Sequence, residues 1–356
     1  MLIEELLELA TYKKASDLHI SAGLPPVIRV DGRLIRVDQQ VLSPDDVESL
    51  VFPMLSNEQR RRLEQEWELD FSYGVQGLSR FRVNIYKDKG SYAAAFRTIN
   101  SVAPSFDTLG LPDIVKKVSD RPRGLVLVTG PTGSGKSTTL ATMIDYINST
   151  RAEHILTIED PIEFVHKSKK SIIHQRELGQ DTRSFSNALR SALREDPDVI
   201  LVGEMRDLET IRLAITAAET GHLVFGTLHT SSASQTIDRI VDVFPEGQQQ
   251  QIRIQLSTSL VAVLSQTLLP RLMPDGSKQG RILAQEILLV NPAIANLIRE
   301  AKTAQIYSTI QTNQGSGMQT LEMALKDLCK QKMIAIDDAL SKSARPDELK
   351  RLLQQQ

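Results

Sequence analysis

The chain has 356 residues, which at about 150 residues per domain predicts two domains. Its 42 basic and 44 acidic residues give a net charge of −2, which argues against a protein that coats nucleic acid by bulk charge. No apolar run approaches the roughly 18 residues of a membrane-spanning helix, and the N-terminus carries acids where a signal peptide would carry bases. Cys329 is the only cysteine, which excludes an internal disulfide and indicates a cytosolic protein.

Residues 1–100 are predicted to form a compact α+β domain. An amphipathic helical stretch at the N-terminus is followed by short β-like runs, among them DLHIS at 17–21 and SRFRVNIY at 79–86. Residues 101–121 contain two prolines and one glycine, and we expect a linker with one short helix there.

From residue 122 the pattern changes to that of an α/β domain, predicted over 122–356. Apolar runs alternate with helical stretches, and strands without polar alternation are typical of a parallel sheet that helices cover on both faces. After about residue 245 we expect a mostly helical chain, with a helical C-terminal region at about 290–356. The apolar runs are LVLVT at 125–129, HILTI at 154–158, VILVGE at 199–204 and HLVFGTL at 222–228.

A phosphate-binding loop, or P-loop, is predicted between the first apolar run and the helix after it. The segment GPTGSGKS at 130–137 matches G-x-x-x-x-G-K-[ST] in full. Its glycines let backbone N–H groups curl around phosphates, and the helix adds the positive end of its dipole. Lys136 is expected to reach the β- and γ-phosphates of ATP, and the Ser137 hydroxyl to bind Mg²⁺. The predicted nucleotide-binding residues here are Gly130, Pro131, Thr132, Gly133, Ser134, Gly135, Lys136, Ser137 and Thr138.

Acidic residues follow two of the apolar runs. Glu159, Asp160 and Glu163 come after HILTI, and Glu204 ends VILVGE. Carboxylates at the carboxyl ends of parallel strands lie where open α/β sheets bind ligands. We expect Glu204 to hold Mg²⁺ through a water molecule and Glu163 to polarise the attacking water.

The histidines do not fit a metal site. His222 and His229 flank the strand HLVFGTL, and at about 3.3 Å per residue they are roughly 23 Å apart, too far to share one ion. His229 lies at the carboxyl end, where it is predicted to sense the γ-phosphate. His222 lies at the opposite end and is expected to make a structural hydrogen bond.

The combination of motifs resembles the secretion ATPases of type IV pili and type II secretion, most closely their pilus-retraction branch. EDPIE resembles the Asp box of that family, VILVGEMRD its Walker B segment and GHLVFGTLHT its His box, and the resemblance covers essentially the whole chain. It implies a PAS-like N-terminal domain, a RecA-like ATPase domain and a ring of six subunits. Further matching segments are DLHISAGLPPVIRVDGRL, TLGLPDIVKK, IIHQRELGQDTRSF and IDRIVDVFP.

The resemblance also implies roles for arginines and for partners. Arg80, Arg82 and Arg97 match positions from which the family sends arginines to the phosphates, and Arg206 is expected to form an ion pair beside Glu204. The implied partners are the integral inner-membrane platform protein of the pilus and a paralogous retraction ATPase, with the ring on the cytoplasmic face. No nucleic-acid partner is expected.

Two features favour the retraction branch. First, assembly motors of this family carry four zinc-binding cysteines and a longer N-terminal extension, and this sequence shows neither feature. Second, NPAIANLIRE at 291–300 resembles the AIRNLIRE motif of retraction ATPases, with Ala295 in place of an arginine. Asn291 is predicted to cap this helix, and Pro292 to begin it. We expect its apolar face to contain Ala293, Ile294, Leu297 and Ile298, with Ala295 exposed beside Arg299, which is predicted to couple turnover to the membrane machinery.

The predicted function is therefore a hexameric, Mg²⁺-dependent ATPase motor that powers pilus retraction in twitching motility. The alternatives are a pilus-assembly or type II secretion motor of the same superfamily, a nucleotide-binding accessory paralogue that regulates the retraction motor, and a DNA translocase on the same core. The missing cysteine cluster opposes the first alternative. The intact Glu163, Glu204 and His229 oppose a protein that binds nucleotide without turnover.

Overall fold

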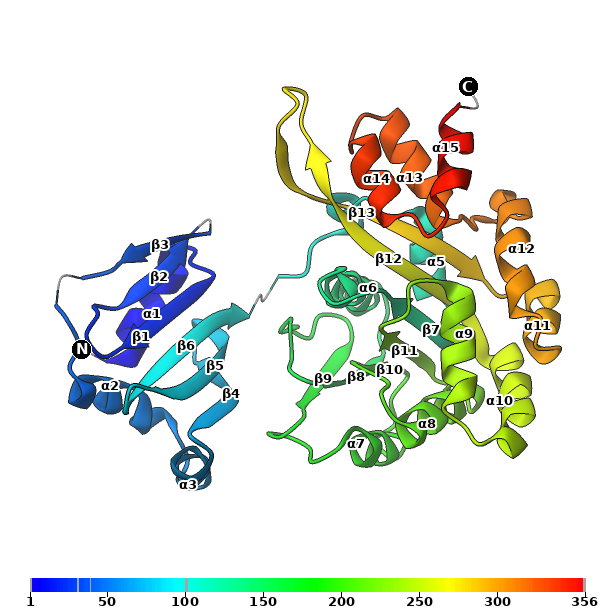
Figure 1. The fold of residues 1–356 in the computed structure, drawn as a ribbon. Coiled ribbons are helices and arrows are strands. Elements are labelled where there is room, and N and C mark those ends of the chain that lie inside the picture. The colour runs from blue at the N-terminus through cyan, green and yellow to red at the C-terminus, as the bar shows by residue number, and fades with distance from the viewer. Residues whose placement is uncertain (1, 31, 39, 100–101, 355–356) are drawn as a thin grey trace. The chain divides into compact units, whose positions relative to one another are not determined.

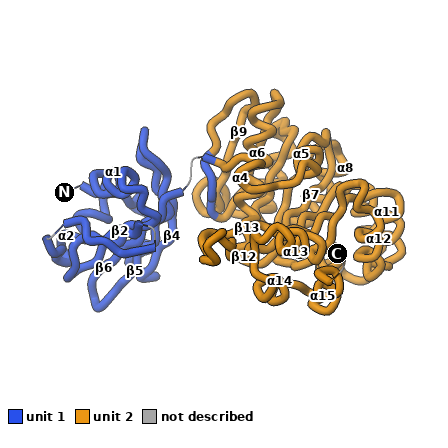
Figure 2. The backbone as a smooth tube through the Cα atoms, turned by 90° about the horizontal axis from the view of Figure 1, so that it is seen from above, with its two compact units in different colours: residues 1–102, 161–165 blue, residues 103–160, 166–356 orange. Residues whose placement is uncertain are grey.

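The structure, a computed structural model, describes residues 2–30, 32–38, 40–99 and 102–354. The chain forms two compact units (Figure 2): unit 1 is residues 1–102 with 161–165, and unit 2 is residues 103–160 with 166–356. Each unit encloses its own hydrophobic core. Residues 100 and 101, where the predicted boundary between domain and linker falls, lie outside the described residues.

Unit 1 is an antiparallel sheet of six strands in the order β3-β2-β1-β6-β5-β4, together with three α-helices among its described residues (Figure 1). Leu6 and Leu7 of its first helix are buried in the core of the unit. The strands are β1 (Asp17–Ser21), β2 (Val27–Val30), β3 (Arg33–Arg36), β4 (Glu68–Val75), β5 (Ser79–Asp88) and β6 (Ser91–Ile99). The helices are α1 (Ile3–Tyr12), α2 (Pro44–Val51) and α3 (Asn57–Glu66).

Strand β5 shows the alternation that its sequence predicts. Phe81, Val83 and Ile85 are buried, whereas Arg82 is exposed and Arg80 is half-buried. Because successive side chains on a strand point to opposite faces, the two arginines share the face away from the core.

Unit 2 is built on a seven-stranded sheet in the order β13-β12-β7-β11-β10-β8-β9. Neighbouring strands are parallel except for β12 and β13, which are antiparallel. The predicted α/β fold is thus observed, with a mixed sheet. The strands are β7 (Gly124–Thr129), β8 (His154–Glu159), β9 (Ile172–Glu177), β10 (Val199–Val202), β11 (Leu223–Leu228), β12 (Leu260–Leu272) and β13 (Lys278–Leu289).

Helices cover both faces of this sheet (Figure 1). Leu125 and Leu127 of β7 belong to one core cluster, which they share with α7 to α10, whereas Val126 and Val128 belong to a second cluster with α5 and α6. A strand buried on both faces has an unbroken apolar sequence, as predicted. The helices are α4 (Phe106–Leu109), α5 (Asp113–Ser119), α6 (Lys136–Thr150), α7 (Phe185–Ala192), α8 (Leu208–Glu219), α9 (Ala233–Asp242) and α10 (Glu246–Ser259).

The prediction of a mostly helical chain after residue 245 is wrong for β12 and β13. Both strands are largely buried where they cross the sheet, and a buried apolar run cannot be distinguished from a buried helix by periodicity alone. The expected helical region from about 290 is observed as α11 (Pro292–Arg299), α12 (Ile306–Thr312), α13 (Leu321–Lys330), α14 (Ile336–Lys342) and α15 (Pro346–Gln354).

Helix α11 begins as predicted but presents a different surface. The Asn291 side chain caps the helix, because it accepts a hydrogen bond of 2.9 Å from the backbone N–H of Ile294. Ile294 and Ile298 are buried, whereas Ala293 is exposed, contrary to expectation. Ala295 is half-buried rather than exposed, and it lines a pocket of about 730 Å³ together with Arg123 and neighbouring residues.

Among the described residues, no helix has both the length and the apolar character needed to cross a membrane.

Candidate functional site

The P-loop connects β7 to α6, as predicted, and its backbone requires glycine. Gly130, Gly133 and Gly135 have φ values of +142°, +77° and +89°, a region that other residues rarely adopt. A side chain on Gly130 would collide with the backbone oxygen of Gln266 and lie 2.6 Å from the Ser134 hydroxyl. Because Gly135 caps α6 without a side chain, the N–H groups of the first helical turn are available to an anion.

Lys136 is held over this loop. Its ammonium donates hydrogen bonds to the backbone oxygens of Gly130, at 2.8 Å, and Pro131, at 3.2 Å. Burial lowers the pKa of Lys136, and the charge of Glu204 partly opposes this effect. The same helical turn exposes Ser137. An ammonium and a hydroxyl therefore lie beside the open N-terminus of α6, an arrangement suited to phosphate groups.

The order of the strands brings the predicted polar residues to one edge of the sheet. From β7 outward, the neighbours are β11, β10 and β8, and all four strands are parallel. Their carboxyl ends therefore meet at the same edge. His229 follows β11, Glu204 follows β10, and Glu159 ends β8.

Glu204 contacts two of the predicted side chains. Its Oε2 atom lies 2.6 Å from the Arg206 guanidinium, and its Oε1 atom lies 3.1 Å from Nε2 of His229. Burial raises the pKa of Glu204, but the contacts with Arg206 and His229 lower it by more, so this pKa stays below its usual value. The structure thus joins Glu204, Arg206 and His229, with Glu204 as an ionised carboxylate at neutral pH.

Comparison with known proteins shows the family of this chain. Residues 1–340 match the type II/IV secretion system protein family. The chain belongs to this family. It is 56% identical over 345 residues to the type IV pilus retraction ATPase PilT of Pseudomonas aeruginosa, a match that covers 97% of this chain and 99% of that protein.

Two further comparisons extend this result. The type IV pilus ATPase PilU of the same organism is 39% identical over 353 residues, covering 99% of this chain and 91% of PilU. A crystal structure of the pilus retraction motor PilT with bound ADP has a TM-score of 0.91 and 52% identity, covering 99% of both chains. The overall fold of this chain is therefore that of a solved member of the family.

Glu159 and Asp160, two of the acids predicted to form an Asp box, differ in their surroundings. Glu159 accepts hydrogen bonds from the Thr157 hydroxyl, at 2.6 Å, and from the Gln175 amide, at 3.2 Å. Asp160 is exposed, and its charge raises the pKa of Arg206, although Glu204 has the larger effect. Glu159 therefore links β8 to β9, whereas Asp160 adds negative charge near Arg206.

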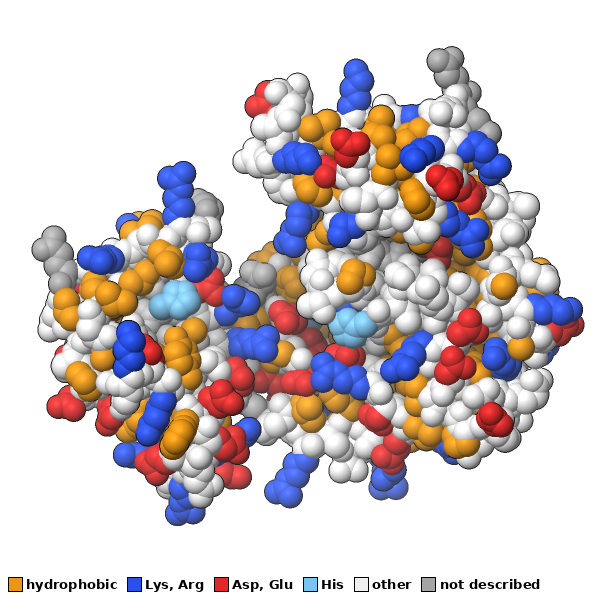
Figure 3. Space-filling view, viewed as in Figure 1, with side chains coloured by type: hydrophobic (Ala, Val, Ile, Leu, Met, Phe, Trp, Pro, Cys, Tyr) orange, Lys and Arg blue, Asp and Glu red, His pale blue; other side chains and the backbone are white. Residues whose placement is uncertain are grey.

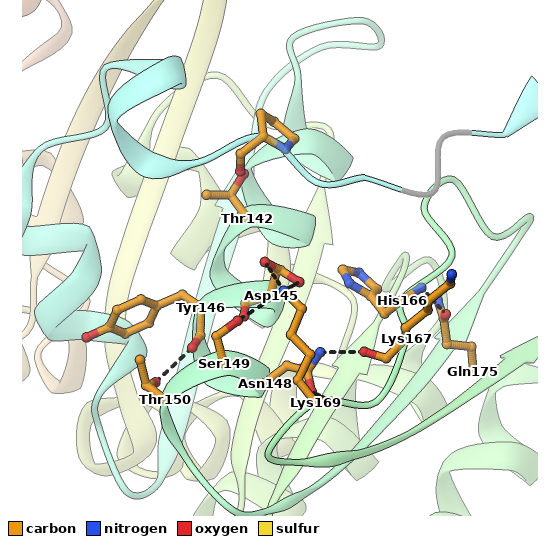
Figure 4. A network of polar contacts seen from close by, with 11 residues as sticks. Thr142, Asp145, Tyr146, Asn148, Ser149, Thr150, His166, Lys167, Lys169 and Gln175 are labelled. Carbon is orange, nitrogen blue, oxygen red and sulfur yellow. Dashed lines mark hydrogen bonds and ion pairs between the residues drawn. The ribbon is translucent and has the colours of Figure 1, made fainter.

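A polar network fastens the chain after the Asp box to α6 (Figure 4). The Asn148 side chain donates to the backbone oxygen of Lys167, at 2.8 Å, and accepts from the backbone N–H of Lys169, at 2.9 Å. Lys169 also forms a 2.7 Å ion pair with Asp145. Glu163 precedes this anchored stretch and belongs to unit 1, so its action on the P-loop stays a prediction.

The histidines at the two ends of β11 have different surroundings. Nδ1 of His222 lies 2.9 Å from the backbone oxygen of Ala217, a contact within the polypeptide of the kind expected for it. His229 is exposed at the other end, beside Glu204. Within the described ranges, no group of three or more His, Cys, Asp or Glu residues could hold a metal ion.

In unit 1, the predicted arginines lie on neighbouring strands. Arg82 and Arg97 are direct cross-strand partners, and Arg97 is in turn paired with Asp17 of β1. The Arg97 Nε atom donates to Asp17 at 2.9 Å, and Arg29 lies 3.7 Å from the same carboxylate. Burial raises the pKa of Asp17, but Ser16 and Arg97 lower it by more. One acid among three arginines leaves this row positively charged.

Sequence reasoning missed a residue that supports the P-loop from behind. The Gln266 amide donates to the backbone oxygen of Ser134, at 2.9 Å, and its oxygen accepts from the Thr139 hydroxyl and the Gln285 amide, each at 3.2 Å. Gln266 and Gln285 are cross-strand partners on β12 and β13. The only signal in the sequence is a glutamine within each of two apolar runs.

Proposed function

We propose that this protein is an Mg²⁺-dependent ATPase motor that powers retraction of type IV pili for twitching motility, as a ring of six subunits. The observation that carries this proposal is the convergence of the P-loop lysine, Glu204, Arg206 and His229 at one sheet edge, in a chain 56% identical to a pilus retraction ATPase. We also propose a location at the cytoplasmic face of the inner membrane, against the platform protein of the pilus, with a paralogous retraction ATPase as a further partner.

In the proposed reaction, the side chains of the site have distinct roles. The backbone N–H groups of the P-loop and Lys136 bind the phosphates of ATP, which lowers the energy of the charge that develops during transfer to water. His229 donates a hydrogen bond to the γ-phosphate, and its contact with Glu204 orients the ring. Glu163 accepts a proton from the attacking water.

The residues of the site fit a magnesium ion. Mg²⁺ prefers oxygen ligands and keeps several of its water molecules, so the Ser137 hydroxyl and the ionised Glu204 carboxylate suffice on the protein side. Both oxygens of Glu204 already contact Arg206 or His229, which favours contact through water. When bound, the ion would neutralise charge on the β- and γ-phosphates.

The arginine row of unit 1 supports a ring in which this unit completes an ATP site. Arg82 is exposed, and the Arg97 side chain remains 69% exposed although it pairs with Asp17, so the row can offer positive charge to phosphate. Among the described residues, unit 2 brings the cations Lys136 and Arg206 to its side of the site. We propose that Arg82 acts on the nucleotide of its own or a neighbouring subunit.

The identity values favour a principal retraction motor over an accessory paralogue. The chain is 56% identical to PilT and 39% identical to PilU of one organism. A DNA translocase is less well supported. On the face drawn in Figure 3, the described Lys and Arg side chains are interspersed with Asp and Glu side chains, whereas proteins that bind nucleic acid present clustered basic residues.

Separate substitutions of the two acids test their assigned roles. Glu163→Gln is expected to slow ATP hydrolysis by about 10²–10⁴ without weakening ATP binding, because the amide cannot accept a proton from water. Glu204→Gln is expected to raise the Mg²⁺ concentration required for turnover. Steady-state kinetics over a magnesium titration distinguish these effects. If Glu204→Gln stops turnover at every magnesium concentration while Glu163→Gln behaves normally, the assignment is reversed.

The exposed end of α11 is expected to act in coupling rather than in hydrolysis. Arg299 is exposed, and Ala295 lines the pocket beside Arg121 and Arg123. Arg299→Ala should reduce pilus retraction several-fold and leave the ATPase rate within about twofold of the wild-type rate, because Arg299 contacts none of the predicted active-site residues. Ala295→Arg, which restores the motif, should preserve or increase retraction. A large loss of ATPase activity in Arg299→Ala would contradict the coupling role.

A further inference from the structure

A buried carboxylate lies behind the loop that carries His229. Glu286 of β13 is only 4% exposed, and its Oε1 atom accepts a hydrogen bond of 2.7 Å from the backbone N–H of Ala233. Ala233 is the first residue of α9. A negative charge at the N-terminus of a helix stabilises that end, because it interacts with unpaired N–H groups and with the helix dipole.

The loop between β11 and α9 is tied to this helix end. The hydroxyls of Thr230 and Thr236 are 2.7 Å apart, and Thr236 also donates to the backbone oxygen of Ser232 at 2.7 Å. Ser232 caps the helix by accepting from the backbone N–H of Gln235. A displacement of the first turn of α9 would therefore displace the loop that begins at His229.

The other surroundings of Glu286 belong to β12 and to the C-terminal helices. Its cross-strand partner is Ser265, whose hydroxyl lies 2.8 Å from that of Thr129, the last residue before the P-loop. The charged groups that act on it are Glu322 of α13 and Arg345, which precedes α15. Glu322 is itself buried and accepts hydrogen bonds from the Tyr307 and Ser343 hydroxyls, each at 2.9 Å.

We propose that Glu286 is a positioning residue, which fixes the His229 loop through the N-terminus of α9 and transmits the state of the C-terminal helices to the ATP site. The inference rests on the proposed role of His229 in hydrolysis. In this role Glu286 acts through its hydrogen bond with the backbone N–H of Ala233. The charge of Glu322 acts on Glu286. Glu322 in turn accepts hydrogen bonds from Tyr307 of α12 and from Ser343, which precedes α15.

The charge of Glu286 changes near neutral pH. Burial raises the pKa of its carboxyl to about 7; the Ala233 N–H and Arg345 lower this pKa, whereas Glu322 raises it. The carboxylate that stabilises the α9 N-terminus therefore forms as the pH rises through about 7. Burial disfavours this charge more than the helix end favours it, so the folded-state pKa lies above the usual value of 4.5. The free energy of unfolding therefore decreases as the pH rises between these two pH values.

The test compares the pH dependence of turnover in the wild type and in Glu286→Gln, which keeps an oxygen acceptor but has no charge. The two rates should be nearly equal at about pH 6, and the wild type should be about three- to tenfold faster at about pH 8, with KM for ATP unchanged. A ratio that stays constant with pH would contradict the proposal.

Glu322→Gln provides the matched comparison. It removes a neighbouring negative charge and keeps the acceptor for Tyr307, so the pKa of Glu286 should fall and the midpoint of the rate profile should move to lower pH. Glu286→Leu, which removes the acceptor, should be slow at every pH. An unchanged midpoint in Glu322→Gln would show that the C-terminal helices do not act through Glu286.

Hydrogen exchange separates failure of this inference from failure of the proposed function. The amides of residues 230–236 should be protected more strongly above pH 7 than below it in the wild type, after correction for intrinsic exchange, and Glu286→Gln should abolish that difference. This readout needs no ATP hydrolysis. An inactive wild-type protein with this protection pattern would refute the ATPase assignment alone, whereas an active one without the pattern would refute the role of Glu286.

Discussion

Lys136→Ala is expected to reduce ATP hydrolysis by at least about 10²–10³, to the background of the assay. The ammonium is held over the P-loop by Gly130 and Pro131, where it would bind the β- and γ-phosphates. Its removal leaves the developing charge without that donor. The fold should survive, because the hydrogen bonds that are lost join Lys136 only to positions in the loop.

Lys342→Ala is the control for this substitution. Lys342 is exposed on α14, within the C-terminal helical region, and its replacement should leave turnover unchanged. Circular dichroism and thermal unfolding verify that both variants are folded. Retention of more than half of the wild-type rate by Lys136→Ala would exclude the P-loop as the ATP site.

Arg82→Ala is expected to cost up to about 10³–10⁵ in the rate of hydrolysis if its guanidinium neutralises charge on the transferred phosphate. Arg82 is exposed beside Arg97 on the sheet of unit 1. Arg97 forms an ion pair of 2.9 Å with Asp17, whereas Arg29 lies 3.7 Å from the same acid. Arg29→Ala, at the other end of this row, is the matched control and should change the rate little.

Mixed rings show whether the arginine acts within one subunit or between two. Lys136→Ala and Arg82→Ala proteins are each expected to be inactive alone. When they are mixed, a site that combines an intact P-loop with the arginine of a neighbour would recover activity. Recovery supports action between subunits, and its absence supports action within one subunit. Equal losses in Arg29→Ala and Arg82→Ala would instead indicate a general electrostatic effect.

The parts of the site that sequence reasoning could predict are local. GPTGSGKS lies directly between a strand and a helix, and the structure has both at those positions. Glu204 and His229 are predicted to share one edge because parallel strands share the direction of their carboxyl ends. Their contact in the structure depends only on β10 and β11 being neighbours.

Contacts between residues far apart in the chain are not predictable from pattern. Gln266 reaches Ser134 across 132 positions, and Glu286 reaches Ala233 across 53. The glutamine and the glutamate both lie in apolar runs for which the sequence predicts helices. The strands β12 and β13 become recognisable only through their pairing with each other and with β7.

The same distinction applies to α11 and to unit 1. The Asn291 cap is predictable because it involves a residue three positions away. The exposure of Ala293 and the partial burial of Ala295 depend instead on which other segments of the polypeptide pack against the helix. The alternation on β5 predicts a shared face for Arg80 and Arg82. The contact between Arg97 and Asp17 spans 80 positions and has no local signal.

Deletion of the gene in its native host, followed by counting of surface pili, tests the proposed function most directly. A retraction motor removes pilin from the fibre, so cells without it should keep long and abundant pili and lose twitching motility. Reintroduction of the wild-type gene should restore a normal number of surface pili and twitching motility, whereas the Lys136→Ala variant should restore neither. Cells that lack surface pili after the deletion would contradict retraction and would indicate an assembly motor.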